Sequence, residues 1–288
     1  MSIGLENTLR DEGLGSRWKK SDVPGFKVVK RSYKLYSNSC NYQISNESYS
    51  TELIGEFDKH ADFNTFIGIC GGGTQVLYLL SKLSKNNQLE SCSIVDIATE
   101  QLKNLEELID IYDKSKDNCA YAKNIAKKIG VTDAVEKTHL CSLYDKYQLS
   151  TNFVKPVPNY NVEIGLYGSD IIDFLKKSDG PGKCFIYLSN ALFSYINNMR
   201  AIGLLSNVLC SPKFKNGTVV FCTVAYGLDG VFLTKNNQKF DVKEFGDNFS
   251  AIKRRYLFEG LGSKIGSYTQ IPQKKVLHQP LSSLYPYL

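Results

Sequence analysis

Three consecutive glycines, Gly71 to Gly73, separate an apolar run from a segment in which apolar residues recur at helical spacing. The apolar run covers 66–70, and the periodic segment covers 76–83. This order predicts a buried strand, a tight turn and a helix. Glycines let backbone N–H groups approach a ligand where a Cβ would collide, and a helix start favours negative charge. We therefore expect a ligand site where this strand ends.

A second apolar run, 92–95, follows the helix and ends on Asp96. An acid about twenty residues after a glycine turn can accept hydrogen bonds from the ribose hydroxyls of a nucleoside. The whole stretch then reads as strand, turn, helix, strand and carboxylate. It predicts a site for a cofactor that contains a nucleoside.

A dinucleotide is a poor match to this turn. The dinucleotide fingerprint is G-x-G-x-x-G, in which the third glycine lets the helix pack closely on the strand. Counted from Gly71, the place of that third glycine is taken by Val76. A glycine-rich turn in another kind of doubly wound domain remains an alternative.

The stretch resembles motif I of the class I S-adenosylmethionine-dependent methyltransferase superfamily. Residues 69–74 correspond to the glycine turn of that family, and Asp96 corresponds to its ribose-binding acid. The family often has an acid at the position of Ile69, so the contact of that acid is either missing here or made by another residue. The triple glycine is also similar to aminopropyltransferases, which continue with an acid where Thr74 stands. The resemblance implies S-adenosylmethionine as cofactor, bound by Cys70, Gly71, Gly72, Gly73, Thr74, Asp96 and Ile97.

Further site residues are expected after the third and fourth strands, predicted over 162–167 and within 184–196. The resemblance implies that Asp170 contacts the adenine amino group, although it can equally cap the following helix. At the fourth strand it implies Ser189 as a cofactor contact and Asn190 and Tyr195 as catalytic residues. The Ser-Asn pair is similar to 3-amino-3-carboxypropyl transferases of betaine-lipid synthesis. Helix capping by Ser189 and Asn190 is the alternative.

The expected fold class is α/β, with a Rossmann-like, doubly wound, mostly parallel sheet, an antiparallel edge and an N-terminal cap. We expect residues 1–60 to form the cap and residues 61–288 the cofactor-binding domain, with a helical insertion near 115–160. Thr99 is expected to cap the helix after Asp96. The antiparallel edge is expected from pairing of 232–242 with part of 256–271.

Composition restricts the class of protein. The 288 residues carry a formal net charge of +6, spread over small clusters typical of solvated faces. The eight cysteines contain no C-x-x-C, no metal site is expected, and the three histidines have no spacing that ties them to the site. No stretch reaches about 18 apolar residues, so no membrane span is expected. We expect a reduced, cytoplasmic protein.

These expectations converge on transfer of a group from S-adenosylmethionine. A methyl group is favoured because methyltransferases dominate the resembled fold, which is an analogy. Transfer of an aminopropyl or 3-amino-3-carboxypropyl group is the first alternative. A non-catalytic scaffold that keeps the fold is the second. The sequence leaves open whether the acceptor is a small molecule or RNA, and it leaves the oligomeric state open.

Overall fold

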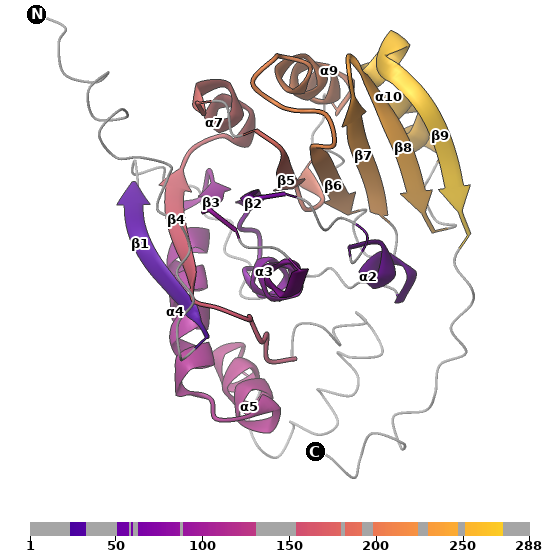
Figure 1. Cartoon of the computed structure of the whole chain (residues 1–288). Coiled ribbons are helices and arrows are strands. Elements are labelled where there is room, and N and C mark those ends of the chain that lie inside the picture. The colour runs from indigo at the N-terminus through magenta and orange to yellow at the C-terminus, as the bar shows by residue number, and fades with distance from the viewer. Residues whose placement is uncertain are drawn as a thin grey trace, which may run out of the picture.

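The chain forms an α/β structure around one large sheet (Figure 1). This computed structural model describes residues 24–32, 51–57, 59, 63–86, 89–130, 154–179, 182–191, 198–223, 230–246 and 251–272. Within these ranges the sheet has nine strands, which lie side by side in the order β1 (Phe26–Ser32), β4 (Val162–Gly168), β3 (Ser91–Asp96), β2 (Thr65–Ile69), β5 (Cys184–Tyr187), β6 (Val219–Thr223), β7 (Gly230–Asn236), β8 (Lys239–Phe245) and β9 (Ile265–Ile271).

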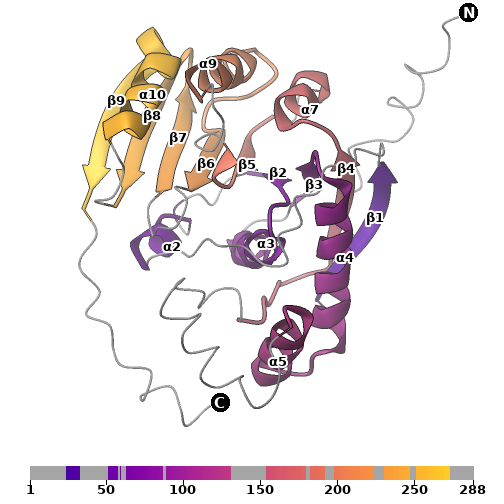
Figure 2. The same cartoon turned by 180° about the vertical axis from the view of Figure 1, so that it is seen from behind.

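Helices cover both faces of this sheet (Figures 1 and 2). One hydrophobic cluster joins the sheet to α2 (Thr51–Phe57), α3 (Thr74–Asn86), α4 (Thr99–Lys114) and α5 (Asn118–Lys128). A second joins the opposite face to α7 (Ile171–Lys177), α9 (Asn198–Leu209) and α10 (Ala251–Leu261), which is followed by the 3-10 turn η2 (Gly262–Lys264).

The two clusters explain why the central strands are almost wholly apolar. Side chains alternate between the faces of a strand, so a strand covered on both faces needs apolar residues at every position. In β2, Phe66 belongs to the first cluster and its neighbour Ile67 to the second. In β5, Phe185 and Ile186 divide in the same way. The central strands therefore form the middle layer of three.

The chain winds in two directions from the centre of the sheet. From β2 it moves through β3 to β4, and it then returns to the other side of β2, where it forms β5 and β6. All pairs from β1 to β6 are parallel. The reversal lies between β2 and β5. In open α/β sheets, ligands bind outside the carboxyl ends of the strands at such a reversal.

The strands after β6 include antiparallel pairs, β6 with β7 and β7 with β8, as expected for this end of the sheet. The segments that pair differ from those that were expected. Segment 232–242 folds on itself, because β7 and β8 pair antiparallel across a turn with Asn237 at φ 57°. Residues 256–261 belong to α10 instead of a strand. The edge strand β9 runs parallel to β8. The expected antiparallel pairing between these two segments is therefore wrong.

The N-terminal region contributes to the sheet. β1 lies within segment 1–60, which we expected to be a cap, and it pairs parallel with β4. The helix α2 lies in the same segment, between β1 and β2 in the chain. The expected helical insertion near 115–160 contains α5, while residues 131–153 lie outside the described residues. Within the described ranges, no helix combines the length and apolar character that crossing a membrane requires.

Candidate functional site

The glycine turn connects β2 to α3 at the reversal of the sheet. Gly71 and Gly73 have φ angles of 50° and 82°, in the left-handed region that glycine adopts at little cost. The Gly73 N–H donates to the Cys70 carbonyl across 2.9 Å, which closes the turn. The Leu77 N–H then donates to the Gly73 carbonyl across 3.2 Å and begins the helical ladder. The predicted strand, turn and helix are confirmed.

Asp96 ends β3 beside this turn. One carboxylate oxygen accepts from the Gly71 N–H across 3.2 Å, and the other accepts from the Ala98 N–H across 2.9 Å. The side chain is 8% exposed. Burial raises the pKa of this carboxyl to about 6, because desolvation outweighs the hydrogen bonds from Ala98, Gly71 and Ile97, which lower it. A carboxylate has about four lone-pair positions, so acceptor capacity remains after three such bonds.

Two of the glycine N–H groups have partners within the protein. The Gly71 N–H donates to Asp96 and the Gly73 N–H donates to the Cys70 carbonyl, while cofactor contacts by the glycines stay a prediction. Gly73 is required for packing as well, since a Cβ there would lie 2.7 Å from Leu108 Cδ1. At Gly71 a Cβ would come no closer than 3.7 Å, to Ser189 Oγ. At Gly71 and Gly73, therefore, the turn is defined by its backbone conformation and close packing, and both N–H groups donate within the protein.

Two residues of helix α4 are hydrogen-bonded to the turn. The buried Cys70 thiol donates to the Gln101 carbonyl across 3.1 Å, and the Asn104 amide donates to the Gly72 carbonyl across 3.2 Å. Burial raises the pKa of the Cys70 thiol well above its usual value, and Asp96 adds to this effect. Cys70 is thus a neutral, structural thiol. Thr74 is also buried, at the first position of α3.

The end of β5 also lies next to the turn, because β5 is the neighbour of β2 on the side opposite β3. Ser189 has a φ of 52°, which is uncommon for a residue with a side chain. Its carbonyl accepts from the Thr223 N–H across 2.9 Å, which ties the end of β5 to the end of β6. Asn190 is half-buried next to it, whereas Tyr195 lies outside the described residues. The structure thus brings Ser189 close to Gly71, whose N–H donates to Asp96.

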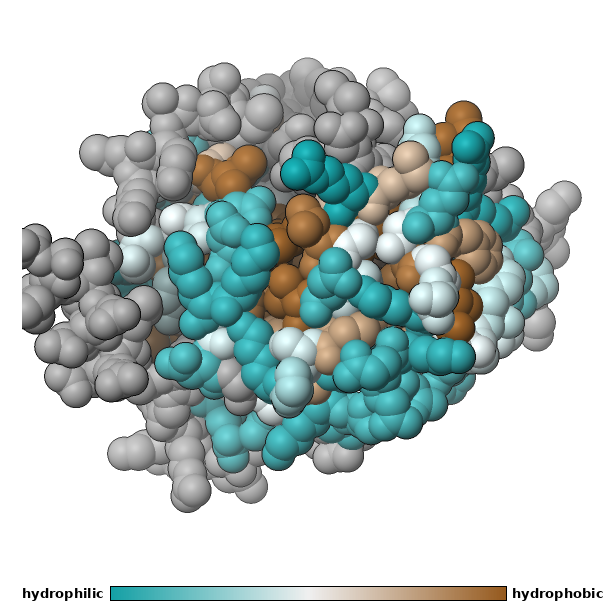
Figure 3. All heavy atoms as spheres, turned by 90° about the horizontal axis from the view of Figure 1, so that it is seen from above, coloured by the Kyte–Doolittle hydropathy of each residue, from teal (hydrophilic) through white to brown (hydrophobic). Residues whose placement is uncertain are grey.

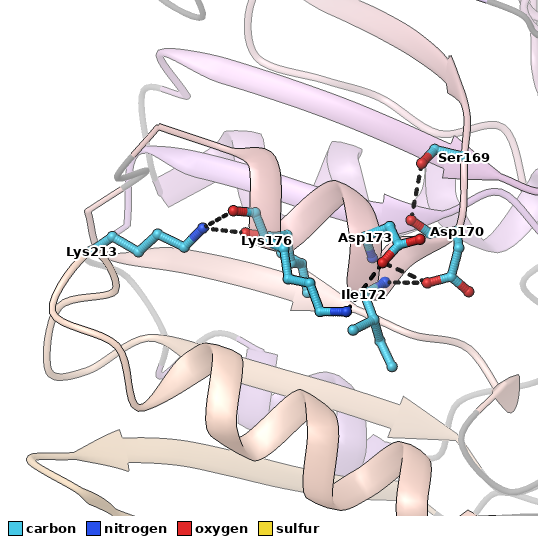
Figure 4. Close-up of polar contacts among 7 residues, drawn as sticks. Ser169, Asp170, Ile172, Asp173, Lys176 and Lys213 are labelled. Carbon is cyan, nitrogen blue, oxygen red and sulfur yellow. Dashed lines mark hydrogen bonds and ion pairs between the residues drawn. The ribbon is translucent and has the colours of Figure 1, made fainter.

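Asp170 is exposed and serves as the N-cap of α7. Its carboxylate accepts from the N–H groups of Ile172 and Asp173 across 2.8 and 3.1 Å (Figure 4). The capping alternative is confirmed, and an adenine contact stays a prediction. The Ser169 N–H donates to the Asp96 carbonyl across 3.0 Å, so the segment before this cap adjoins the site. Ile97, beyond Asp96, is 39% exposed.

Sequence analysis missed Thr223, the last residue of β6. Its side chain is fully buried, and its hydroxyl has no hydrogen-bond partner among the described residues. A polar residue that closes an apolar strand next to the reversal is the signal that could have found it. Sequence analysis also missed Gln101 and Asn104, which hold the turn from α4, because contacts between residues about thirty positions apart leave no local pattern.

No group of three or more histidine, cysteine, aspartate or glutamate side chains suited to a metal ion occurs among the residues described here. His60, His139 and His278 lie outside those residues.

The chain matches no protein-family model, and a search of curated proteins finds no match.

Proposed function

We propose that the protein binds S-adenosylmethionine at the reversal of a Rossmann-like sheet and transfers a group from it, most simply the methyl group. The observation that carries this proposal is the contact of the Gly71 N–H with the Asp96 carboxylate. It joins a glycine turn to a buried acid at the ends of two adjacent parallel strands. A nucleoside ribose needs such an acid, and the reversal is where ligands bind in this class of sheet.

The hydrogen bonds that the Gly71 and Gly73 N–H groups make within the protein favour S-adenosylmethionine over a dinucleotide. A pyrophosphate is bound by free backbone N–H groups at the start of a helix. Here the N–H groups of Gly71 and Gly73 are donated within the protein. Val76, at the position of the third fingerprint glycine, is fully buried. A ligand without phosphate, with a ribose for Asp96 to bind, fits this turn better.

The cofactor supplies its own leaving group, so the protein's task is to orient the acceptor and exclude water. Ser189 and Asn190 stand where β5 leaves the sheet, on the other side of the reversal from Asp96. We assign cofactor contacts to Ser189 and positioning of the acceptor to Asn190, with Tyr195 as a further catalytic residue. The acceptor is a small molecule or RNA.

The free cysteines of the described segments suit a cytoplasmic location, where thiols stay reduced. They are Cys70, Cys92, Cys119, Cys184, Cys210 and Cys222.

A second candidate is a scaffold that keeps the fold without catalysis. Asp96 favours this candidate, because its carboxylate is almost wholly buried and already accepts several backbone N–H groups. The position of Ile69 favours it too, since the resembled family often has an acid there. Transfer of a 3-amino-3-carboxypropyl or aminopropyl group remains a further alternative on the same fold.

Product analysis distinguishes these candidates. The full chain is incubated with S-adenosylmethionine and with acceptor pools of RNA or of small molecules, and the spent cofactor is identified by mass spectrometry. Methyl transfer leaves S-adenosylhomocysteine, whereas carboxypropyl transfer leaves methylthioadenosine. The proposal expects S-adenosylhomocysteine, reduced at least tenfold in Asn190→Ala. Cofactor that binds but stays intact with every pool would favour the scaffold.

A further inference from the structure

The two edge strands of the sheet differ in how they are protected. An edge strand presents unpaired backbone groups to solvent, and proteins block such edges with charges, prolines or bulges. β1 carries Lys27, Lys30 and Arg31 within seven residues, and its register shifts between Val28 and Lys30. The three positive charges distinguish this edge from β9.

β9 contains no charged residue and no proline, and its register against β8 shifts only near its start, where Ile265 and Ser267 face consecutive residues of β8. Its seven residues read Ile-Gly-Ser-Tyr-Thr-Gln-Ile, and those from Gly266 to Gln270 are exposed. In Figure 3, pale residues of intermediate hydropathy gather at the right-hand flank, the side on which β9 lies in Figure 1. An exposed, uncharged edge strand of this length is a site for strand addition.

The backbone of β9 shows which groups are available for pairing. The Ile271 carbonyl accepts from the Gly246 N–H across 3.1 Å, so the backbone of Ile271 is directed at the β8 side. Backbone direction alternates along a strand, so Thr269 and Ser267 face β8 as well. The N–H and carbonyl groups of Tyr268 and Gln270 therefore point away from the sheet.

Reversing β9 leaves isoleucine at both ends, Tyr268 at the centre and a hydroxyl residue on one side of it facing another hydroxyl residue, whereas Gly266 faces Gln270. When two copies pair antiparallel about Tyr268, Ser267 meets the partner's Thr269, Gly266 meets the partner's Gln270 and Ile265 meets the partner's Ile271. Every pair is uncharged, so no like charges face each other. Tyrosine, β-branched and hydroxyl pairs are those that stabilise antiparallel strands. A twofold axis requires such self-complementarity, because the same patch meets itself.

Tyr268, at the centre of this arrangement, is already held in place. Its hydroxyl donates to Glu244 Oε2 across 2.7 Å, and its ring lies edge-on to Phe258 with 5.1 Å between centroids. Glu244 is fully buried and pairs with Arg254. A side chain held in this way loses little further rotamer freedom when it meets a partner.

We propose that β9 is a dimerisation edge at which a second copy of this chain pairs antiparallel about Tyr268. Pairing then adds about four to six backbone hydrogen bonds and joins two sheets into one. The interface of one strand is below about 1,200 Å², so the dimer is weak and its dissociation constant is on the order of micromolar.

Sedimentation velocity from about 1 to 100 µM tests this proposal. The wild-type chain is expected to shift from monomer to dimer over this range. Gln270→Pro removes an N–H that points outward, which leaves the β8 side intact, and Gln270→Ala keeps this N–H while removing the same side chain. The proline variant is expected to stay monomeric and the alanine variant to dimerise, with equal melting temperatures at low concentration.

Amide hydrogen exchange provides a second measurement that needs no variant. The amides of Tyr268 and Gln270 are expected to gain at least tenfold protection at the high concentration only, whereas those of Ser267 and Thr269 stay unchanged. A chain that remains monomeric at all concentrations overturns the proposal. So does a Gln270→Pro variant that dimerises as readily as Gln270→Ala.

Discussion

The backbone N–H of Gly71 donates to the carboxylate of Asp96 across 3.2 Å, and this contact joins the turn after β2 to the end of β3. The acid assigned to the ribose is therefore also a structural part of the glycine turn. If the proposed cofactor binds here, substitution of Asp96 changes both the turn and the binding of that cofactor.

Asp96→Ala is expected to weaken S-adenosylmethionine binding at least tenfold, because charge-assisted hydrogen bonds to the ribose are worth about 1.5 to 3 kcal/mol. Calorimetric titration measures this change. Asp110→Ala is the control, since it removes an equal charge from an exposed position on α4, where Asp110 pairs with Lys114. An affinity that is unchanged in Asp96→Ala would mean that the ribose binds elsewhere.

The pKa of Asp96, about 6, predicts a pH dependence of binding and of stability. Affinity is expected to fall below pH 6, because a protonated carboxyl loses acceptor capacity. The folded pKa lies above the usual 3.8, so the folded state holds the proton more tightly than the unfolded state. Stability from this group therefore declines as pH rises from about 4 to 6, by roughly 2 to 3 kcal/mol, and is constant above.

Asp96→Asn isolates this contribution, since the amide does not titrate. The difference in unfolding free energy between wild type and Asp96→Asn is expected to vary between pH 4 and 6 and to be flat above. Urea denaturation at each pH measures it. A difference that is flat over the whole range would show that the folded-state pKa of Asp96 is unshifted.

Gly73→Ala is expected to destabilise the fold by about 2 to 4 kcal/mol, through backbone strain at φ 82° and a collision with Leu108. Gly130→Ala is the matched control, because Gly130 has a φ of 81° and the Cβ that alanine adds there would meet no atom within 4 Å. It is expected to cost only about 1 to 2 kcal/mol. Equal losses in thermal unfolding would show that Leu108 moves aside without cost.

Thr223→Val is expected to raise the melting temperature, because it replaces a buried hydroxyl that lacks a partner among the described residues. The size expected is about 1 kcal/mol. Thr218→Val is the contrast at the opposite end of β6, where the hydroxyl donates to the Gly182 carbonyl across 3.3 Å. This variant is expected to be less stable than wild type. Destabilisation by both substitutions would reveal a partner for Thr223.

The centre of the fold could be predicted because its signals are local. The apolar run before Gly71, the periodic segment after Gly73 and the run that ends at Asp96 each define an element without reference to distant residues. The cap of α7 by Asp170 is local in the same sense. For these elements, therefore, sequence patterns and structure agree.

The expectations that differ from the structure depend on distant or competing contacts. β1 pairs with β4, about 130 residues later, so its short alternating pattern has no local partner. Thr99 was expected to cap α4, but the N-cap is Ala98, whose N–H donates to Asp96. The parallel pairing of β9 with β8 requires α10 as a crossover, and that helix has only a weak apolar periodicity.

Calorimetric titration of the full chain with S-adenosylmethionine at pH 7.5 tests the central claim most directly. We expect saturable binding with one site per chain, retained in Asp110→Ala and lost or at least tenfold weaker in Asp96→Ala. The absence of binding heat at several temperatures, together with no shift in melting temperature at millimolar cofactor, would contradict the account.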